Sequence, residues 1–186
     1  MIWVFGGKAT IWLTEWTKSE SLLKHALAVE AAMRAYAKHF REDEILWGNT
    51  GLLHDFDYEK HPKAPDHPTV GMQHLKEQGW PEEMIHAIAG HAEYMQVSRD
   101  SLLDKTLFAV DELCGLITAI AYTRPNRTLA EVTVQSVLKK MKDASFARTV
   151  SRDDIRNGVA ELEVPLEEHI ECCLTGMQAI AADLKL

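Results

Sequence analysis

Apolar residues recur at intervals of three and four positions through the first third of the chain. Within residues 17–40 that interval defines one helical face, made by Leu22, His25, Val29, Met33, Tyr36 and Phe40. The same spacing returns in residues 81–95 and 98–122, and no convincing strand-like alternation follows residue 16. The pattern therefore predicts an all-α fold.

Turn-forming residues interrupt this pattern and mark the helix ends. Thr17-Lys18-Ser19-Glu20 has the spacing of a capping box, so we expect the first long helix to begin there. Pro62 and Pro65 indicate a loop over residues 56–66. The predicted helices cover about residues 17–40, 43–54, 66–79, 81–95, 98–122, 131–143, 152–162 and 165–184. Before them, Val4-Phe5-Gly6-Gly7-Lys8 fits a short strand and turn, or a leader with little order.

The bulk properties indicate one soluble domain. The 186 residues contain no repeat or low-complexity linker, so we expect residues 1–186 to form a single domain. The net charge of −8 argues against binding to nucleic-acid polymers, and no apolar run reaches the ~18 residues of a membrane span. Three cysteines without a disulfide framework favour a reducing compartment, so we expect a cytoplasmic protein.

Two histidines and two aspartates lie on or beside the apolar helical faces: His25, His54, Asp55 and Asp111. Burial of an ionised aspartate costs free energy unless a cation or hydrogen-bond donors compensate. A shared metal ion would account for all four residues. Because neighbouring residues differ by about 100° around a helix, His54 and Asp55 can reach one ion only near a helix end. The loop signals after Phe56 place them at such an end.

The order His, His-Asp, Asp on consecutive helices resembles the HD superfamily of metal-dependent phosphohydrolases over about residues 17–125. Several local motifs carry the resemblance: Gly51-Leu-Leu-His-Asp55, His67-Pro-Thr-Val-Gly71, Ile88-Ala-Gly-His91 and Ala109-Val-Asp111-Glu-Leu. The run Val110-Asp-Glu-Leu-Cys-Gly-Leu-Ile-Thr-Ala119, followed by Arg124-Pro125, resembles a bacterial subgroup of predicted HD-superfamily hydrolases.

This resemblance implies a fold and a set of ligands. The fold would be an HD-domain helical bundle, with a five-helix metal-binding core over about 17–125 and a C-terminal helical extension over 126–186. The ligands of the first metal would be His25, His54, Asp55 and Asp111. His67 and His91 would bind a second ion, with Asp55 bridging the two. His74, on the same predicted face as His67, is the alternative to it.

The resemblance also implies an activity, the hydrolysis of a nucleotide or other small phosphate ester by metal-activated water. Asp55, His54 and Lys60 would be the catalytic residues, with Lys63 and Arg124 as further candidates for contacting phosphate. The cofactor would be one or two divalent ions, for which a histidine-rich set favours Mn, Fe, Co, Ni or Zn over Mg alone. The partner would be a small phosphorylated substrate, with no nucleic-acid polymer and no membrane, and the oligomeric state stays open.

Two other functions fit the same fold. Some HD relatives are di-iron oxygenases that use a six-ligand histidine and aspartate set. A non-catalytic module would use the fold only to bind a nucleotide or a protein, but such modules lose ligands that this chain keeps.

Some residues depart from the family pattern or have no clear role. Phe56-Asp57 follows the His-Asp pair where relatives carry Ile-Gly, Lys60 is displaced, and His91 is single where some relatives have two histidines. The Gly-Tyr-Pro signature of cyclic-dinucleotide phosphodiesterases is absent. We expect the loop at 56–66 to set substrate specificity. Glu112 suits either a supporting role at the metal or the helix surface, and the remaining histidines are expected at the surface: His39, His61, His86 and His169.

Overall fold

Helices are the only regular elements in the computed structural model, which describes residues 7–186, and no strand occurs in that range. The α-helices are α1 (Lys8–Trp16), α2 (Glu20–Phe40), α3 (Glu44–Leu53), α4 (Asp66–Glu77), α5 (Glu82–His91), α6 (Leu102–Tyr122), α7 (Val134–Met141), α8 (Arg152–Leu162), α9 (Leu166–Ala179) and α10 (Ala181–Leu184). Short 3₁₀ helices, η1 (Glu93–Met95) and η2 (Leu129–Glu131), follow α5 and α6. The predicted all-α fold is confirmed.

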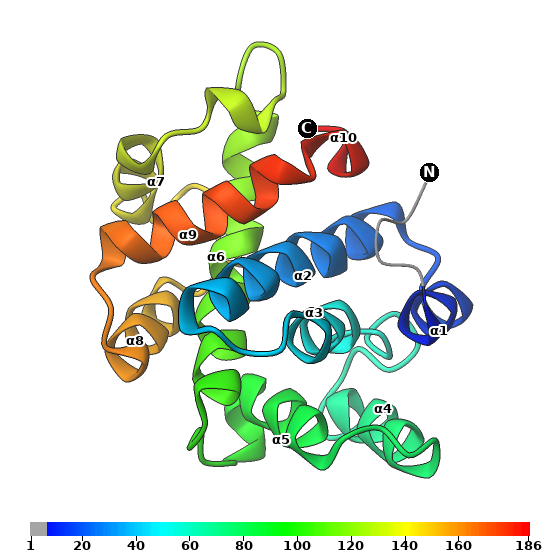
Figure 1. Ribbon diagram of the computed structural model, residues 1–186. Coiled ribbons are helices and arrows are strands. Elements are labelled where there is room, and N and C mark those ends of the chain that lie inside the picture. The colour runs from blue at the N-terminus through cyan, green and yellow to red at the C-terminus, as the bar shows by residue number, and fades with distance from the viewer. Residues whose placement is uncertain (1–6) are drawn as a thin grey trace.

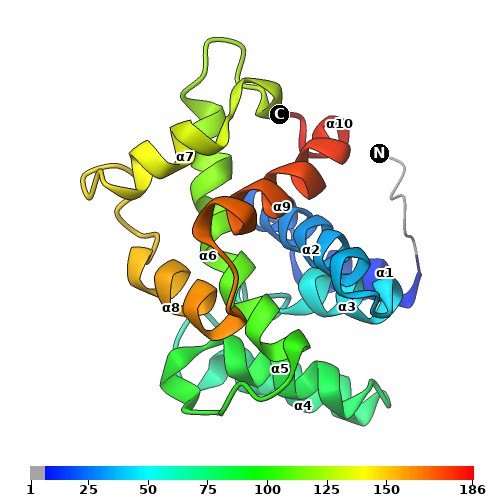
Figure 2. The ribbon, with the colours of Figure 1, turned by 60° about the vertical axis from the view of Figure 1, so that its left-hand side comes forward.

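Two helices of 21 residues each, α2 and α6, form the centre of the molecule. Helix α2 packs against α3, α6 and α9, and helix α6 packs in addition against α5 and α8. Helices α4 and α5 lie at one end of the molecule, and α7 and α10 lie at the other (Figures 1 and 2). The C-terminal helices therefore cover α2 and α6 directly.

The hydrophobic core follows from this arrangement. Side chains with no exposed surface come from both central helices and from α3, among them Met33, Leu53, Leu107, Leu113 and Ile117. Burial of each such side chain away from water contributes about 1.5–3 kcal/mol to the stability of the fold. Because α6 has neighbours on several sides, it buries residues around most of its circumference.

Gly51 lets α3 approach the backbone of α2. A Cβ at this position would lie 2.8 Å from Met33 Cγ and 2.9 Å from the Val29 carbonyl oxygen, too close for a side chain. The close approach brings the end of α3, which carries His54, beside the helix that carries His25.

Residues 8–16 form a helix, so the expectation of a strand or an unordered leader is wrong for Lys8, whereas residues 4–6 lie outside the described part of the chain. Helix α1 is stabilised by contacts with residues far along the chain. The Trp12 ring lies 4.3 Å from the His74 ring, and the Trp16 ring lies 5.1 Å from the Phe56 ring. Such contacts have no signature in the local sequence.

The predicted capping box at Thr17 is also wrong, because α2 begins at Glu20 after Ser19. The Thr17 hydroxyl instead donates to the Phe56 carbonyl at 2.9 Å. The Glu59 carboxylate accepts from the backbone N–H groups of Lys18 and Ser19 at 2.7 and 2.9 Å. A carboxylate from the loop after α3 therefore accepts from the N–H groups before α2, in place of the Glu20 side chain that a capping box would use.

Other helix ends differ by a few residues from their predicted positions. Helix α6 begins after Ser101, which forms a capping box with Asp104, rather than near residue 98. The predicted helix at 165–184 is divided at Ile180 into α9 and α10.

His169 is fully buried, which contradicts its expected place at the surface. The Tyr36 hydroxyl donates to its Nδ1 at 2.6 Å, and its Nε2–H donates to the Ala109 carbonyl at 2.9 Å. Burial lowers the pKa of His169 to about 4, although the Ala109 hydrogen bond acts in the opposite direction. His169 is therefore a neutral core residue that joins α9 to both central helices.

None of the helices within residues 7–186 has the length and apolar character needed to cross a membrane.

Candidate metal centre

Five helices bring together the six predicted metal ligands. His25 lies on α2, His54 and Asp55 follow the end of α3, and Asp111 lies on α6. His67 is in the first turn of α4, and His91 is the last residue of α5. Four of these side chains come from helix ends, where the chain direction changes and neighbouring residues can turn toward one point. We call these six residues the His/Asp cluster.

The first part of the cluster surrounds Asp111. Its Oδ1 lies 2.9 Å from His25 Nε2 and 3.4 Å from His54 Nε2. His54 Nε2 also lies 3.6 Å from Asp55 Oδ2. Ligand atoms of His25, His54 and Asp55 lie within 4.8 Å of one another, a spacing that allows them to share one metal ion.

The second part of the cluster surrounds the other oxygen of Asp55. Asp55 Oδ1 lies 3.2 Å from both His67 Nε2 and His91 Nε2. These three residues again offer atoms within 4.8 Å of one another. Asp55 belongs to both groups through its two oxygens, so the carboxylate lies between two neighbouring sets of metal-ligating atoms.

Three histidines use Nδ1 for a hydrogen bond outside the cluster. His54 donates to the Gly51 carbonyl at 2.7 Å, His67 to Asp57 Oδ1 at 2.7 Å, and His91 to the Ile88 carbonyl at 2.5 Å. In a neutral ring, Nε2 then carries a lone pair instead of a proton. A lone pair that faces a carboxylate oxygen is stable only if a proton or a cation lies between them.

His54 is the clearest case, because its Nε2 is buried and has no hydrogen-bond partner in the described structure. Burial opposes charge on its ring, but Asp55 and Asp111 outweigh that effect and raise the pKa of His54 to about 10. Burial also opposes charge on the His67 ring, but Asp55 and Asp57 outweigh that effect and raise the pKa of His67 to about 9. The surroundings of His54 and His67 therefore favour positive charge on these two rings.

A divalent cation would supply that charge, and the donor set suits one. Imidazole nitrogens and carboxylate oxygens together favour borderline transition metals. The hydrogen bonds from Nδ1 would hold each ring with its lone pair toward the ion, as in metal sites generally. The residues present therefore fit one or two such ions.

His74, the alternative ligand, does not join the cluster. Its ring lies 4.3 Å from Trp12 and 4.9 Å from Trp16, so it forms part of the aromatic contact between α4 and α1. His67 is the histidine of α4 that meets Asp55.

The predicted phosphate contacts lie outside the cluster in this structure. Lys60 is exposed, and its Nζ lies 4.2 Å from the centre of the Trp16 ring. Lys63 is exposed on the loop before α4, and the half-buried Arg124 follows the end of α6. Their contact with phosphate stays a prediction.

Glu112 accepts a hydrogen bond from the Ser151 N–H at 3.0 Å and is half-buried. Burial and the adjacent Asp111 raise the pKa of Glu112 to about 7. Its carboxylate thus joins α6 to the start of α8 beside the cluster.

Asp57, for which the sequence predicted no role, lies beside the cluster with no exposed surface. Its Oδ1 accepts from His67 Nδ1 at 2.7 Å, and its Oδ2 accepts from the Gly71 N–H at 2.8 Å. The available signal was the replacement of glycine by aspartate after the His-Asp pair, which we noted only as a departure from the family pattern.

Two exposed tyrosines, Tyr58 and Tyr94, contact His67. The Tyr58 ring meets the His67 ring edge to face at 5.1 Å, and the Tyr94 hydroxyl donates to the His67 carbonyl. They are 38% and 50% exposed, so aromatic surface is available beside the cluster.

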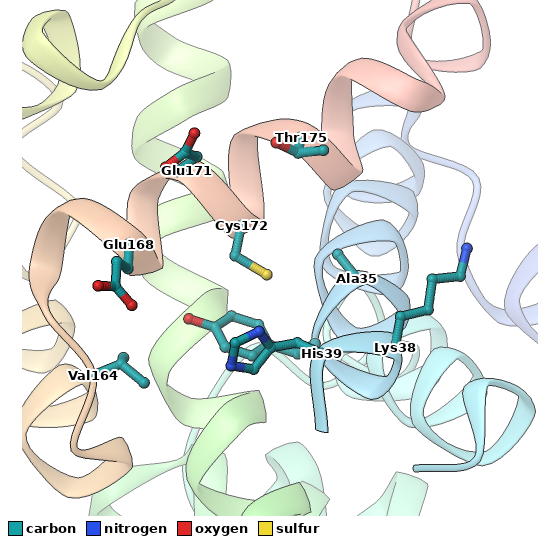
Figure 3. Close-up of a pocket in the computed structure, with 9 residues that line it drawn as sticks. Ala35, Lys38, His39, Val164, Glu168, Glu171, Cys172 and Thr175 are labelled. Carbon is teal, nitrogen blue, oxygen red and sulfur yellow. The ribbon is translucent and has the colours of Figure 1, made fainter. Parts of the chain in front are cut away.

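A hollow of about 550 Å³ lies elsewhere, between the C-terminal half of α2 and α9 (Figure 3). His39 and Cys172 line it, together with the carboxylates of Glu168 and Glu171. Burial raises the pKa of Cys172 to about 11, so its sulfur stays a thiol at neutral pH. No residue of the His/Asp cluster lines this hollow, and it is not the candidate active site.

Comparison with known proteins identifies a family over the part of the chain that carries the His/Asp cluster. The model of the family described as "HD domain" matches residues 22–116, slightly more than half of the chain. Ribonuclease Y of Desulforudis audaxviator (strain MP104C) is 36% identical over 73 residues, which make up 39% of this chain and 14% of that protein. The chain thus matches a small part of that relative. No solved structure matches the chain.

Proposed function

The chain belongs to the HD domain family, and from that premise we propose that it is a metal-dependent phosphohydrolase. Its substrate would be a nucleotide or another small phosphate ester. The observation that carries the proposal is the position of Asp55, whose Oδ2 faces His54 Nε2 and whose Oδ1 faces His67 Nε2 and His91 Nε2. That arrangement suits two metal ions bridged by one carboxylate.

In this proposal, the ligands of the first ion are His25, His54, Asp55 and Asp111, and those of the second are Asp55, His67 and His91. The buried Nε2 of His54, which has no hydrogen-bond partner, supports the first assignment. The two 3.2 Å approaches to Asp55 Oδ1 support the second. The histidine-rich set favours Mn, Fe, Co, Ni or Zn over Mg alone.

The metal would lower the pKa of a bound water from ~15.7 toward ~7, which makes hydroxide available at neutral pH. The protein would contribute orientation and charge. Asp55 would hold the reacting water between the two groups of ligands, and His54 would keep its lone pair directed inward through its bond to Gly51. Lys60 would leave the Trp16 ring to contact the phosphate, which its exposed side chain allows.

We propose further that the whole chain is a single HD domain. The metal-binding core would cover about residues 17–125, and residues 126–186 would form an extension. The packing of α8 on α6 and of α9 on α2 supports a single domain, since the C-terminal helices cover the helices that carry Asp111 and His25.

The test measures phosphate release from a panel of nucleotides, sugar phosphates and a short RNA, with and without chelator. The RNA is included because the relative is named a ribonuclease. We expect metal-dependent release from at least one small ester and its loss in Asp55→Ala. Asp153→Ala, which removes an aspartate whose side chain is 87% exposed on α8, is the matched control and should keep full activity. Absence of metal-dependent release from every ester would refute the proposal.

A di-iron oxygenase is the second candidate, because a carboxylate shared by two histidine-rich groups also suits a pair of iron ions. Oxygen consumption by iron-loaded protein, without phosphate release from the panel, would favour this second function. Binding of a nucleotide that survives Asp55→Ala, with neither activity present, would favour a non-catalytic module.

A further inference from the structure

We propose that Asp57 is the positioning residue of the second metal site, because it determines which nitrogen of His67 is free to bind metal. The inference rests on the proposed function, since it needs a second ion held by Asp55, His67 and His91. Nothing in the family resemblance predicts this role, because relatives carry glycine at the position of Asp57.

The two hydrogen bonds of Asp57 fix which of its partners carries a proton. The Gly71 N–H is a backbone donor, so the Asp57 oxygen that faces it, at 2.8 Å, must accept. The other oxygen, 2.7 Å from His67 Nδ1, is also an acceptor and therefore requires a proton on Nδ1. In the neutral ring that binds a metal, His67 Nε2 then presents its lone pair to the point that Asp55 Oδ1 faces from 3.2 Å.

Asp57 is held in this position by close packing. It is fully buried, and a Cβ on Gly71 would lie 2.9 Å from both its Cγ and its Oδ2. Only glycine at position 71 allows this approach. The glycine of the His-x-x-x-Gly motif and the aspartate that departs from the family pattern are therefore parts of one structural unit.

Substitution of Asp57 by asparagine should reverse the tautomer of His67 with little change in volume. The single amide oxygen must accept from Gly71, because the backbone donor cannot change its role. The amide NH₂ then faces His67 Nδ1, which can only accept, so the ring proton moves to Nε2. A protonated Nε2 cannot bind a metal ion.

The experiment titrates the metal-free protein with Mn²⁺ and follows binding by calorimetry and by the electron paramagnetic resonance of the free ion. We expect the wild type to bind two ions. Asp57→Asn should bind the first with unchanged affinity and the second about 10–100-fold more weakly, the usual cost of losing a supporting hydrogen bond at a metal ligand. Glu83→Gln, which removes an exposed carboxylate from the first turn of α5, should bind both ions like the wild type.

A double-mutant cycle separates positioning from general damage. In a His67→Ala background, Asp57→Asn should have no further effect on binding of the second ion, because the ring that Asp57 orients is gone. An equal loss of affinity for both ions, or a further loss in the His67→Ala background, would overturn the inference.

A measurement on the wild type applies even if Asp57→Asn does not fold. Nitrogen NMR of the Zn²⁺-loaded protein should show His67 protonated at Nδ1 and metal-bound at Nε2, and the opposite tautomer would overturn the inference. If wild type and Asp57→Asn each bind two ions, with the same affinities, the role of Asp57 is refuted and the proposed function stays intact. A single ion in the wild type would refute the second metal site and the inference with it, whereas metal-dependent hydrolysis itself is refuted only by the absence of phosphate release.

Discussion

Replacement of Gly51 by alanine should destabilise the protein, although alanine is the better helix former. The added Cβ would lie 2.8 Å from Met33 Cγ, 2.9 Å from the Val29 carbonyl oxygen and 3.0 Å from the Glu30 nitrogen. Two of these atoms belong to the backbone of α2, so rotation of a side chain cannot relieve the overlap. Helices α2 and α3 must therefore move apart.

Two opposing effects set the size of the change. Alanine gains about 0.5–1 kcal/mol over glycine inside a helix. Overpacking of a well-packed core costs about 1–3 kcal/mol. We expect the overpacking to win by about 1–2 kcal/mol, because the contacts are with backbone atoms in the middle of α2. For a chain of this length, such a loss lowers Tm by about 2–8 °C.

Gly115→Ala is the matched control, since Gly115 also lies inside a helix. A Cβ there would meet only Val150 Cγ2, at 3.8 Å, which is an ordinary contact. This variant should therefore be more stable than the wild type by about 0.5–1 kcal/mol. Thermal and denaturant unfolding in excess chelator would measure both variants without a contribution from metal. A Tm for Gly51→Ala at or above that of the wild type would refute the packing argument.

Three further predictions concern the buried histidine and the metal. Because burial lowers the pKa of His169 from 6.5 to about 4, its contribution to the unfolding free energy should be complete above about pH 6.5. It should be lost as the pH falls to about 4, by about 3 kcal/mol in total, and comparison with His169→Gln by denaturant unfolding at each pH would test this. Tyr36→Phe should cost about 1–3 kcal/mol at neutral pH, because it leaves a buried nitrogen of His169 without a donor; a loss below 0.5 kcal/mol would contradict the hydrogen bond. Free Mn²⁺ at about 100 times its Kd should stabilise the wild type by about 2.7 kcal/mol, and an unchanged Tm in calorimetry would argue against a metal centre.

The helices and their ligand-bearing positions were largely predictable from the sequence. Helical periodicity depends on residues three and four apart, so the inward position of His25 on α2 could be read from its neighbours. Turn signals likewise placed His54 and Asp55 at the end of α3, as the structure has them. The grouping of the six residues came from their order along the chain and from the family resemblance, and their role as ligands remains a prediction.

Only the tertiary structure revealed the partners of the polar groups in loops and in the core. Asp57 meets His67, ten positions further along the chain, across a segment that is mostly irregular, and no periodic pattern connects them. The partner of His169, Tyr36, lies 133 positions away on another helix, so a histidine expected at the surface is a core residue. The sequence by itself determined which residues face inward along each long helix, because that depends on neighbours one turn away. Which polar side chain hydrogen-bonds to which histidine depends on how separate helices and loops pack. That packing, and not the recognised motifs, places Asp57 against His67 Nδ1.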